Sequence, residues 1–176
     1  MRRSGNDWQS VTGSYIVYQN QFNTSNHTAP WIWFVFKRPV GGRIARFKGF
    51  FIKNFNSPSA GISVPLICYR ASNIDTTGEI IVVPTKKDTT YPSPTTLVTN
   101  GAGVQPTGTQ GNQRLLAIGG CRTGANGFSF GTDEWRALDI RDEIVLNQDN
   151  EGIWFVMEQN TNVNTSWYFE AEWIEI

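Results

Sequence analysis

The sequence predicts an all-β protein, and three observations lead to this prediction. Charged residues make up only 17% of the 176 residues, so the charge patterns that are typical of surface helices are scarce. Aromatic residues make up 13%, beside 17 Gly and 8 Pro, and this composition favours short strands joined by turns. Hydrophobic residues reach 39%, which supplies a real core. The length suits one domain, which we place at 13–176 after an N-terminal arm at 1–12.

The clearest strand pattern lies at the C-terminal end. Between residues 167 and 174 every second side chain is Trp, Phe or Ala, and those between them are largely acidic. A period of two with one apolar face predicts a half-buried strand. Residues 151–159 follow the same pattern, and 143–146 come just before them, across the turn formers of 147–152. The three segments predict a closing β-meander.

Further strands are expected upstream, where β-branched and aromatic residues cluster between turn formers. They are placed at 14–19, 31–38, 43–55, 62–70, 79–83 and 114–118, which gives about nine strands and no major helix. One helical alternative is open over 133–147, where Trp135, Leu138, Arg141 and Val145 are spaced by three or four. The turn cluster that follows favours an extended chain there.

Residues 84–113 differ in composition from the rest. Their thirty positions hold four Pro, four Gly and eight Thr, and such a stretch is expected to bury little. Two interpretations remain open. The segment is a mobile surface excursion, or it is an arm that lies along a neighbouring subunit, with Tyr91 and the residues 92–94 supplying contact area.

The run from Trp31 to Phe36 is apolar on both faces of any strand that it forms, and residues 50–52 repeat the effect. In a two-layer sandwich one face of a strand packs inward and the other normally meets water. A second apolar face therefore needs a cover, which is either a loop of the same chain or another subunit. The second case predicts an oligomer with aromatic contacts at its interface.

The zero net charge hides an asymmetry along the chain. Residues 1–70 carry nine Lys and Arg against one acid, Asp7, whereas the remaining residues carry six basic and fourteen acidic side chains. In a compact β-domain the two halves interleave, which predicts charge-balanced sheets. The alternative is one basic and one acidic face, suited to docking on a charged surface. We expect no nucleic-acid partner, because no recognised motif is present.

Residues that could carry a reaction are few. His27 is the only histidine, and Cys68 and Cys121 are too few for a zinc site or a disulfide scaffold. Paired carboxylates occur at 133/134, 142/143 and 170/172, and the last pair could serve a glycosidase or could simply face solvent. We predict no enzyme, no metal and no cofactor.

No signal peptide and no membrane-spanning run is seen, so we expect a soluble protein made in a cytoplasm.

Several segments together carry a resemblance. In order they are a basic pair of strands at 37–53, Val-Pro-Leu-Ile-Cys-Tyr-Arg at 64–70, Pro-Thr-Lys-Lys-Asp at 84–88, Arg-Asp-Glu-Ile-Val-Leu at 141–146, Glu-Gly-Ile at 151–153, and the aromatic and acidic last strand. This order resembles the small β-sandwich proteins of tailed bacteriophages that decorate the head or serve as minor head proteins, over most of 13–176. The resemblance implies a protein that is no enzyme, binds coat-protein surfaces and forms trimers or other symmetric clusters.

Together these observations predict a jelly-roll-like β-sandwich that acts as a virion structural protein on the capsid, assembled in the host cytoplasm. Its expected partners are the major capsid protein and other copies of itself, with a homotrimer favoured. The residues expected to bind a partner are Arg2, Arg3, Trp31, Trp33, Arg43 and Arg46. The alternative is a carbohydrate-binding or receptor-binding module, which should leave two or three aromatic side chains in an open groove.

Overall fold

The computed structural model describes residues 2–4, 7–9, 13–23, 29–54, 66–101, 104–119, 132–158 and 166–176. These residues form fourteen strands and no helix. The strands are β1 (Arg2–Ser4), β2 (Asp7–Gln9), β3 (Gly13–Asn23), β4 (Trp31–Lys37), β5 (Ala45–Asn54), β6 (Leu66–Asp75), β7 (Ile80–Ile81), β8 (Thr85–Lys86), β9 (Leu97–Asn100), β10 (Thr107–Ile118), β11 (Thr132–Arg136), β12 (Ile144–Leu146), β13 (Gly152–Met157) and β14 (Ser166–Glu175).

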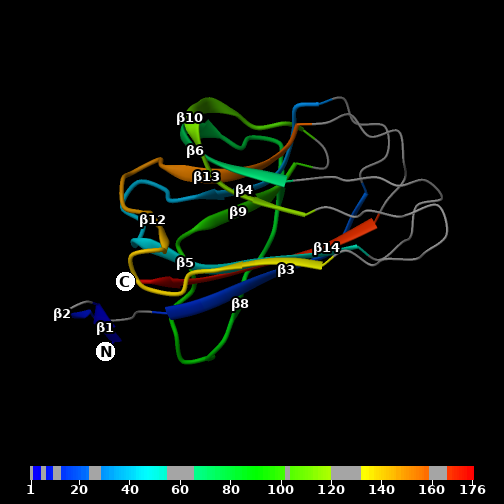
Figure 1. The fold of residues 1–176 in the computed structure, drawn as a ribbon. Helices are drawn as coiled ribbons and strands as arrows, with labels where there is room; N and C mark the ends of the chain where they lie inside the picture. Colours follow the sequence, from blue (N-terminus) through cyan, green and yellow to red (C-terminus); the bar gives the residue numbers. More distant parts are fainter. Residues whose placement is uncertain are drawn as a thin grey trace.

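Two antiparallel sheets face each other (Figure 1). Sheet I has the order β11-β5-β14-β3-β8, with the short β12 also paired to β5. Sheet II has the order β10-β6-β13-β4-β9-β7. Strands β1 and β2 pair only with each other, in a separate two-stranded sheet. The predicted all-β sandwich is therefore confirmed.

The pairing of the eight main strands is nested. The first, β3, pairs with the last, β14; β4 pairs with β13, β5 with β11, and β6 with β10. The chain therefore behaves as one long hairpin that is wrapped so that its strands alternate between the two sheets, which is the topology of a jelly roll. Strands β7, β8 and β9 are an insertion between β6 and β10, at the tip of this hairpin.

Aromatic side chains fill the space between the sheets. Phe34 of sheet II stacks on Phe169 of sheet I with 4.1 Å between ring centroids, and Phe36 meets Phe47 and Trp173 edge to face. Such pairs contribute about 0.5–1.5 kcal/mol each beyond the area that they bury. The inward residues of β14, which are Phe169, Ala171 and Trp173, are those that the alternating sequence pattern marks as apolar, so this part of the core follows directly from the sequence.

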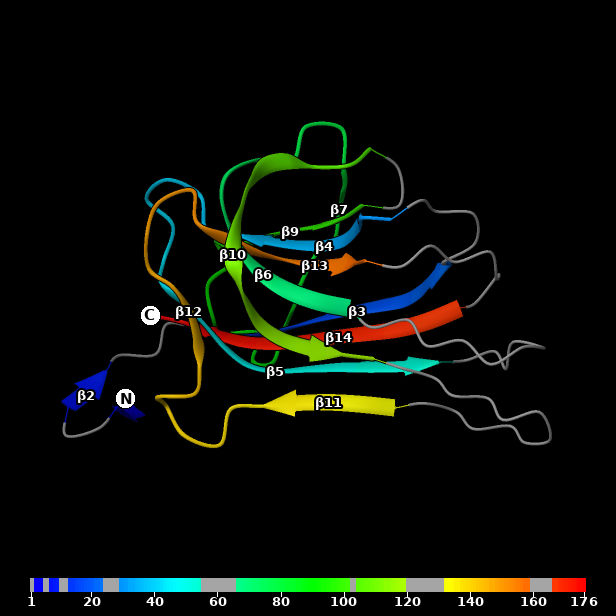
Figure 2. The same cartoon turned by 45° about the horizontal axis from the view of Figure 1, so that its top comes forward.

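A second apolar cluster covers the outer face of sheet II. It contains Val35, Ile67, Tyr69, Ala71, Ile74, Trp154 and Val156, all of them buried. Strand β10 curves across this face (Figure 2). The indole nitrogen of Trp154 donates to Gln110 at 3.2 Å, and a Cβ on Gly108 would lie 3.3 Å from the Trp154 ring. Of the two covers expected for the Trp31–Phe36 run, a segment of the same chain is the correct one.

The segment 84–113 is more ordered than its composition predicts. It supplies β8, β9 and the first half of β10, and the residues Thr96, Val98, Thr99 and Asn100 are buried. The expectation of little burial is wrong for them, because four strand-forming residues at 97–100 pair with β4. Composition averaged over thirty residues hides so short a strand.

The helical alternative over 133–147 is also wrong, since this stretch forms β11, a turn and β12.

The docking of this segment on β4 depends on a glycine. A Cβ on Gly101 would lie 2.0 Å from the backbone carbonyl oxygen of Ile32. We predict that Gly101→Ala lowers the free energy of unfolding by about 1–3 kcal/mol, as overpacking does, in urea denaturation. As a comparison, Gly111→Ala meets its nearest atom at 3.3 Å and should cost less. Equal losses for the two variants would contradict this account of the β4–β9 contact.

Candidate interaction surface

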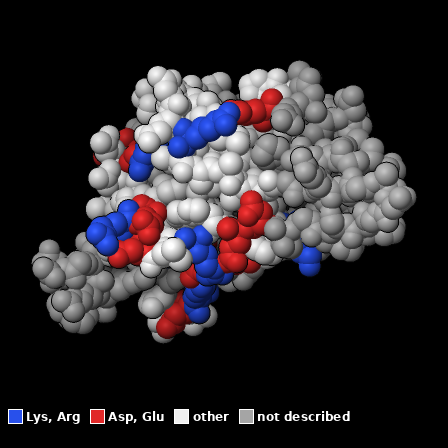
Figure 3. Space-filling view, in the orientation of Figure 1, with Lys and Arg blue, Asp and Glu red and all other residues white. Residues whose placement is uncertain are grey.

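The basic residues of 37–53 pair with acids from the other end of the chain. Arg38 lies 2.6 Å from Asp149, Arg43 lies 2.8 Å from Glu175, and Arg46 lies 2.6 Å from Glu143. The ammonium of Lys48 also contacts Glu143. Basic and acidic side chains accordingly lie next to one another on the surface (Figure 3). For these residues the interleaving interpretation of the charge asymmetry is correct, since nested pairing brings the two halves together.

Glu143 is a buried carboxylate held between two cations. It lies just before β12, which pairs with the stretch of β5 that carries Arg46 and Lys48. The side chain of Glu143 is only 2% exposed. A carboxylate can be buried at this depth only when ion pairs or hydrogen bonds compensate for the lost water. Arg46 is therefore part of the internal structure of sheet I.

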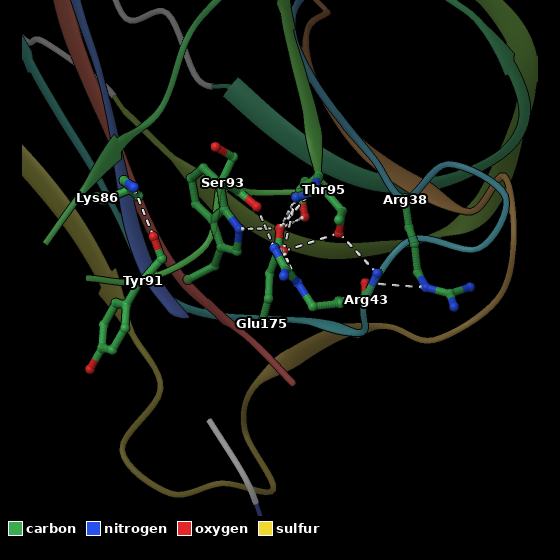
Figure 4. Close-up of polar contacts among 9 residues, drawn as sticks. Arg38, Arg43, Lys86, Tyr91, Ser93, Thr95 and Glu175 are labelled. Atoms are coloured by element: carbon green, nitrogen blue, oxygen red, sulfur yellow. Dashed lines mark hydrogen bonds and ion pairs between the residues drawn. The ribbon is translucent and has the colours of Figure 1, made fainter. Parts of the chain in front are cut away.

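Glu175 is the second buried carboxylate and is fully enclosed (Figure 4). It accepts hydrogen bonds from the backbone N–H groups of Thr95 and Thr96 at 2.9 and 2.8 Å, and from the Thr96 hydroxyl at 2.7 Å. The Nε of Arg43 donates to it at 2.9 Å. This cluster ties the last strand to the 93–96 segment and to the chain before β5.

The cluster keeps Glu175 ionised. Burial by itself raises the pKa of its carboxyl group. The hydrogen bonds from Thr95 and Thr96, together with Arg43, outweigh burial, so the pKa lies below its ordinary value of 4.5. The sequence pattern did not mark Glu175 as different from the other acids of β14, because its partners are about eighty residues away along the chain.

Of the six residues expected to bind a partner, the four whose side chains are described do not gather on one exposed surface. Trp33 is 1% exposed in the core, and the half-buried Trp31 donates from its indole nitrogen to the Gly101 carbonyl at 3.1 Å. Arg43 and Arg46 are held in the ion pairs described above. Arg2 and Arg3 lie in β1, and their side chains are outside the described part.

The structure gives the carboxylate pair 170/172, considered above for a glycosidase, ordinary surroundings. On β14, Glu172 contacts Lys87, and Glu170 accepts a hydrogen bond from the Tyr168 hydroxyl at 3.1 Å. The cavity beside them is about 10 Å³, room for one water rather than a sugar ring.

Among the described residues no three of His, Cys, Asp and Glu gather as metal ligands. Cys68 is buried, which raises the pKa of its thiol, and His27 and Cys121 are outside the described residues.

A group of exposed apolar side chains lies at the edge of sheet II, in and after β7 and at Val104 near Gly78. We call it the edge patch, and it consists of Ile80, Ile81, Val83 and Val104. Ile81 is 65% and Val83 is 83% exposed. The Val82 N–H donates to Val98 of β9, so the backbone groups of Ile81 and Val83 point away from β9. Among the described strands β7 has no second neighbour, and an apolar edge of this kind is a template for pairing with another chain.

The buried ion pairs should matter for stability far more than exposed ones. We predict that Arg46→Ala lowers the free energy of unfolding by about 3–5 kcal/mol, because it leaves Glu143 buried with one cation. The control is Arg141→Ala, whose pair with Asp139 is exposed and should change stability by about 0–1 kcal/mol. Thermal unfolding of both variants gives the comparison, and similar small losses would contradict an internal role for Arg46.

The lowered pKa of Glu175 predicts a pH dependence. Because the folded-state pKa is below the unfolded one, the ionised carboxylate stabilises the fold above pH 4.5, and this stabilisation is lost as the pH falls through the lowered pKa. Glu175→Gln should be less stable than the original chain at neutral pH, and its stability should fall less on acidification. Urea unfolding from pH 7 downwards measures both. Parallel pH profiles would contradict the prediction.

No helix among the described residues is long and apolar enough to cross a membrane. Comparison of the chain with protein-family models, with curated proteins and with solved structures found no match. The functional assignment therefore depends on the chain's own geometry and on the resemblance of its sequence segments.

Proposed function

We propose that this chain is a structural protein of a virus particle, a decoration or minor head protein of a tailed bacteriophage that binds the coat-protein surface as an oligomer. The observation that carries the proposal is the edge patch on a jelly-roll sandwich. Jelly rolls recur in viral capsid proteins and in lectins, so the fold narrows the choice without deciding it. The segment order from the basic strands to the aromatic last strand supports the first of these classes.

The edge patch is suited to contacts between subunits. Its side chains are aliphatic and each is more than half exposed. Burying an exposed Ile or Val stabilises an association by about 1.5–3 kcal/mol, and the free backbone groups of Ile81 and Val83 can extend sheet II into a partner. The Trp31–Phe36 run no longer supports an oligomer, because the side chains from Trp33 to Phe36 are buried within the single chain, each at most 1% exposed. The trimer stays our expectation, with the edge patch as its contact.

Attraction between charges contributes less to the proposed binding of a coat protein than the sequence predicts. Most of the basic side chains of 37–53 have acidic partners in the same chain, so they have little charge to offer a coat protein. Arg2 and Arg3 remain proposed contacts of the N-terminal arm. Exposed charges steer encounter and fix register, while buried apolar contacts supply most of the affinity.

A sugar site built on stacked aromatic rings has little support from the described residues. The large apolar side chains that are exposed among them are all aliphatic: Val40, Ile80, Ile81, Val83, Val104 and Leu138. The distinguishing feature expected of such a module, two or three aromatic side chains in an open groove, is not seen in this part of the chain.

The first test of the proposal is the protein composition of purified virus particles. Mass spectrometry of particles purified from the phage that encodes the chain should find it at a fixed ratio to the coat protein. Absence of the chain from intact particles would overturn the proposal.

The edge patch is tested by a double variant. Ile81→Lys with Val83→Lys should abolish self-association in light scattering and weaken binding to particles at least tenfold, because two charges replace the apolar contact. The control is Leu138→Lys, which places the same charge at a 94% exposed residue outside the patch and should change neither. An original chain that is monomeric at all concentrations, or a double variant that assembles normally, would show that the patch is not the contact.

A further inference from the structure

A depression of about 220 Å³ lies at one end of the sandwich, away from the edge patch. One wall consists of residues 148–151, in the turn between β12 and β13. The other walls are residues 70–73 of β6 and residues 109–111 of β10. Three segments that are distant in sequence therefore form one depression, which we call the end groove.

The charged groups of the end groove are already paired. Arg70 contacts Glu151 and donates to the Val145 carbonyl at 2.9 Å. Glu151 also accepts the backbone N–H groups of Asn147 and Gln148, at 3.0 and 3.1 Å. Asp149 pairs with Arg38. The groove is consequently neutral overall, and neither an anion nor a cation would find an unpaired opposite charge in it.

Five neutral polar side chains line the groove, four of them exposed and that of Asn150 half-buried. They are the hydroxyls of Ser72 and Thr109 and the amides of Asn73, Gln148 and Asn150. Each hydroxyl and each amide both donates and accepts hydrogen bonds. A ligand that matches them must itself present several groups that donate and accept, without net charge, and the hydroxyls of a sugar meet this requirement.

Two of the residues that carry these side chains have an uncommon backbone conformation. Asn73 and Asn150 have φ angles of +52° and +58°, in the left-handed region that residues other than glycine rarely adopt. The Asn150 N–H donates to the Arg38 carbonyl at 2.9 Å, and the Arg38 N–H donates to the Glu151 carbonyl at 2.8 Å. The turn is thus fixed against the chain after β4. A fixed turn holds the backbone of Asn150 in place before a ligand arrives, which lowers the entropic cost of binding.

We propose that the end groove binds a neutral saccharide, with Asn73 and Asn150 as the principal hydrogen-bonding residues. The groove is small and lacks an aromatic ring, so it holds one sugar unit with a dissociation constant of about 1 mM. This site differs from the aromatic groove that a stacking module needs. The inference does not depend on the proposed role in a particle, because it concerns the isolated chain.

The test uses ¹⁵N-labelled chain in NMR titrations. The probes are maltotriose, cellotriose, chitotriose and mannotriose, with inorganic phosphate and calcium chloride as charged probes. We expect one neutral saccharide to shift the amide signals of 72–73, 109–111 and 148–151, and the charged probes to leave them unchanged. Absence of a response to all four saccharides, or a response to phosphate or calcium alone, would overturn the proposal.

The variants separate recognition from folding. Asn73→Gly with Asn150→Gly removes both amides and keeps a residue suited to positive φ, so the fold should be retained. We expect this variant to lose at least tenfold in saccharide affinity. Asn147→Ala is the matched control, since Asn147 lies in the same turn but does not line the groove, and its affinity should be unchanged. An unchanged affinity in the double variant would show that the sugar binds elsewhere.

Discussion

The pairing of the first half of the chain with the second half is the constraint on which the rest of the structure depends. β14 lies between β3 and β5, and β13 lies between β4 and β6. This arrangement sets basic β5 beside acidic residues of the last forty positions, so that Glu143 and Glu175 can be buried as ions. Without that pairing each carboxylate would have a prohibitive cost of desolvation. The charge asymmetry along the chain is therefore a consequence of the nested topology.

The ion pairs within the chain limit which groups its surface presents to a partner. Most of the basic groups of 37–53 and their acidic partners neutralise one another, and β10 covers the outer apolar face of sheet II. The described surface then has two distinctive features, the aliphatic edge patch and the neutral end groove. The first fits a protein partner and the second a ligand with hydroxyl groups. They lie on different parts of the molecule, so an assembled particle could use both.

The success of sequence-based prediction follows the strength of the local pattern. Each of the nine expected strands has a counterpart, because alternation in segments such as 167–174 reports burial on one face of a sheet. Strand β9 was missed because Thr and Asn at 99 and 100 are uncommon as buried residues, and they are buried here only against β4. The spacing of Trp135 and Leu138 wrongly suggested the apolar face of a helix. Leu138 is exposed, so it belongs to no buried face.

By itself the sequence determined the fold class, the main strands and the apolar content of the core, since these depend on residue types and their spacing along one segment. Only the tertiary structure decided which side chains are available to a partner. Trp33 and Arg46 are prominent in the sequence but internal in the fold, whereas Ile81, Val83, Asn73 and Asn150 are unremarkable in the sequence but lie at an exposed edge or line a groove. The physical reason is that covers, ion pairs and grooves are made by segments that meet only when the hairpin wraps, and no local pattern records where distant strands will lie.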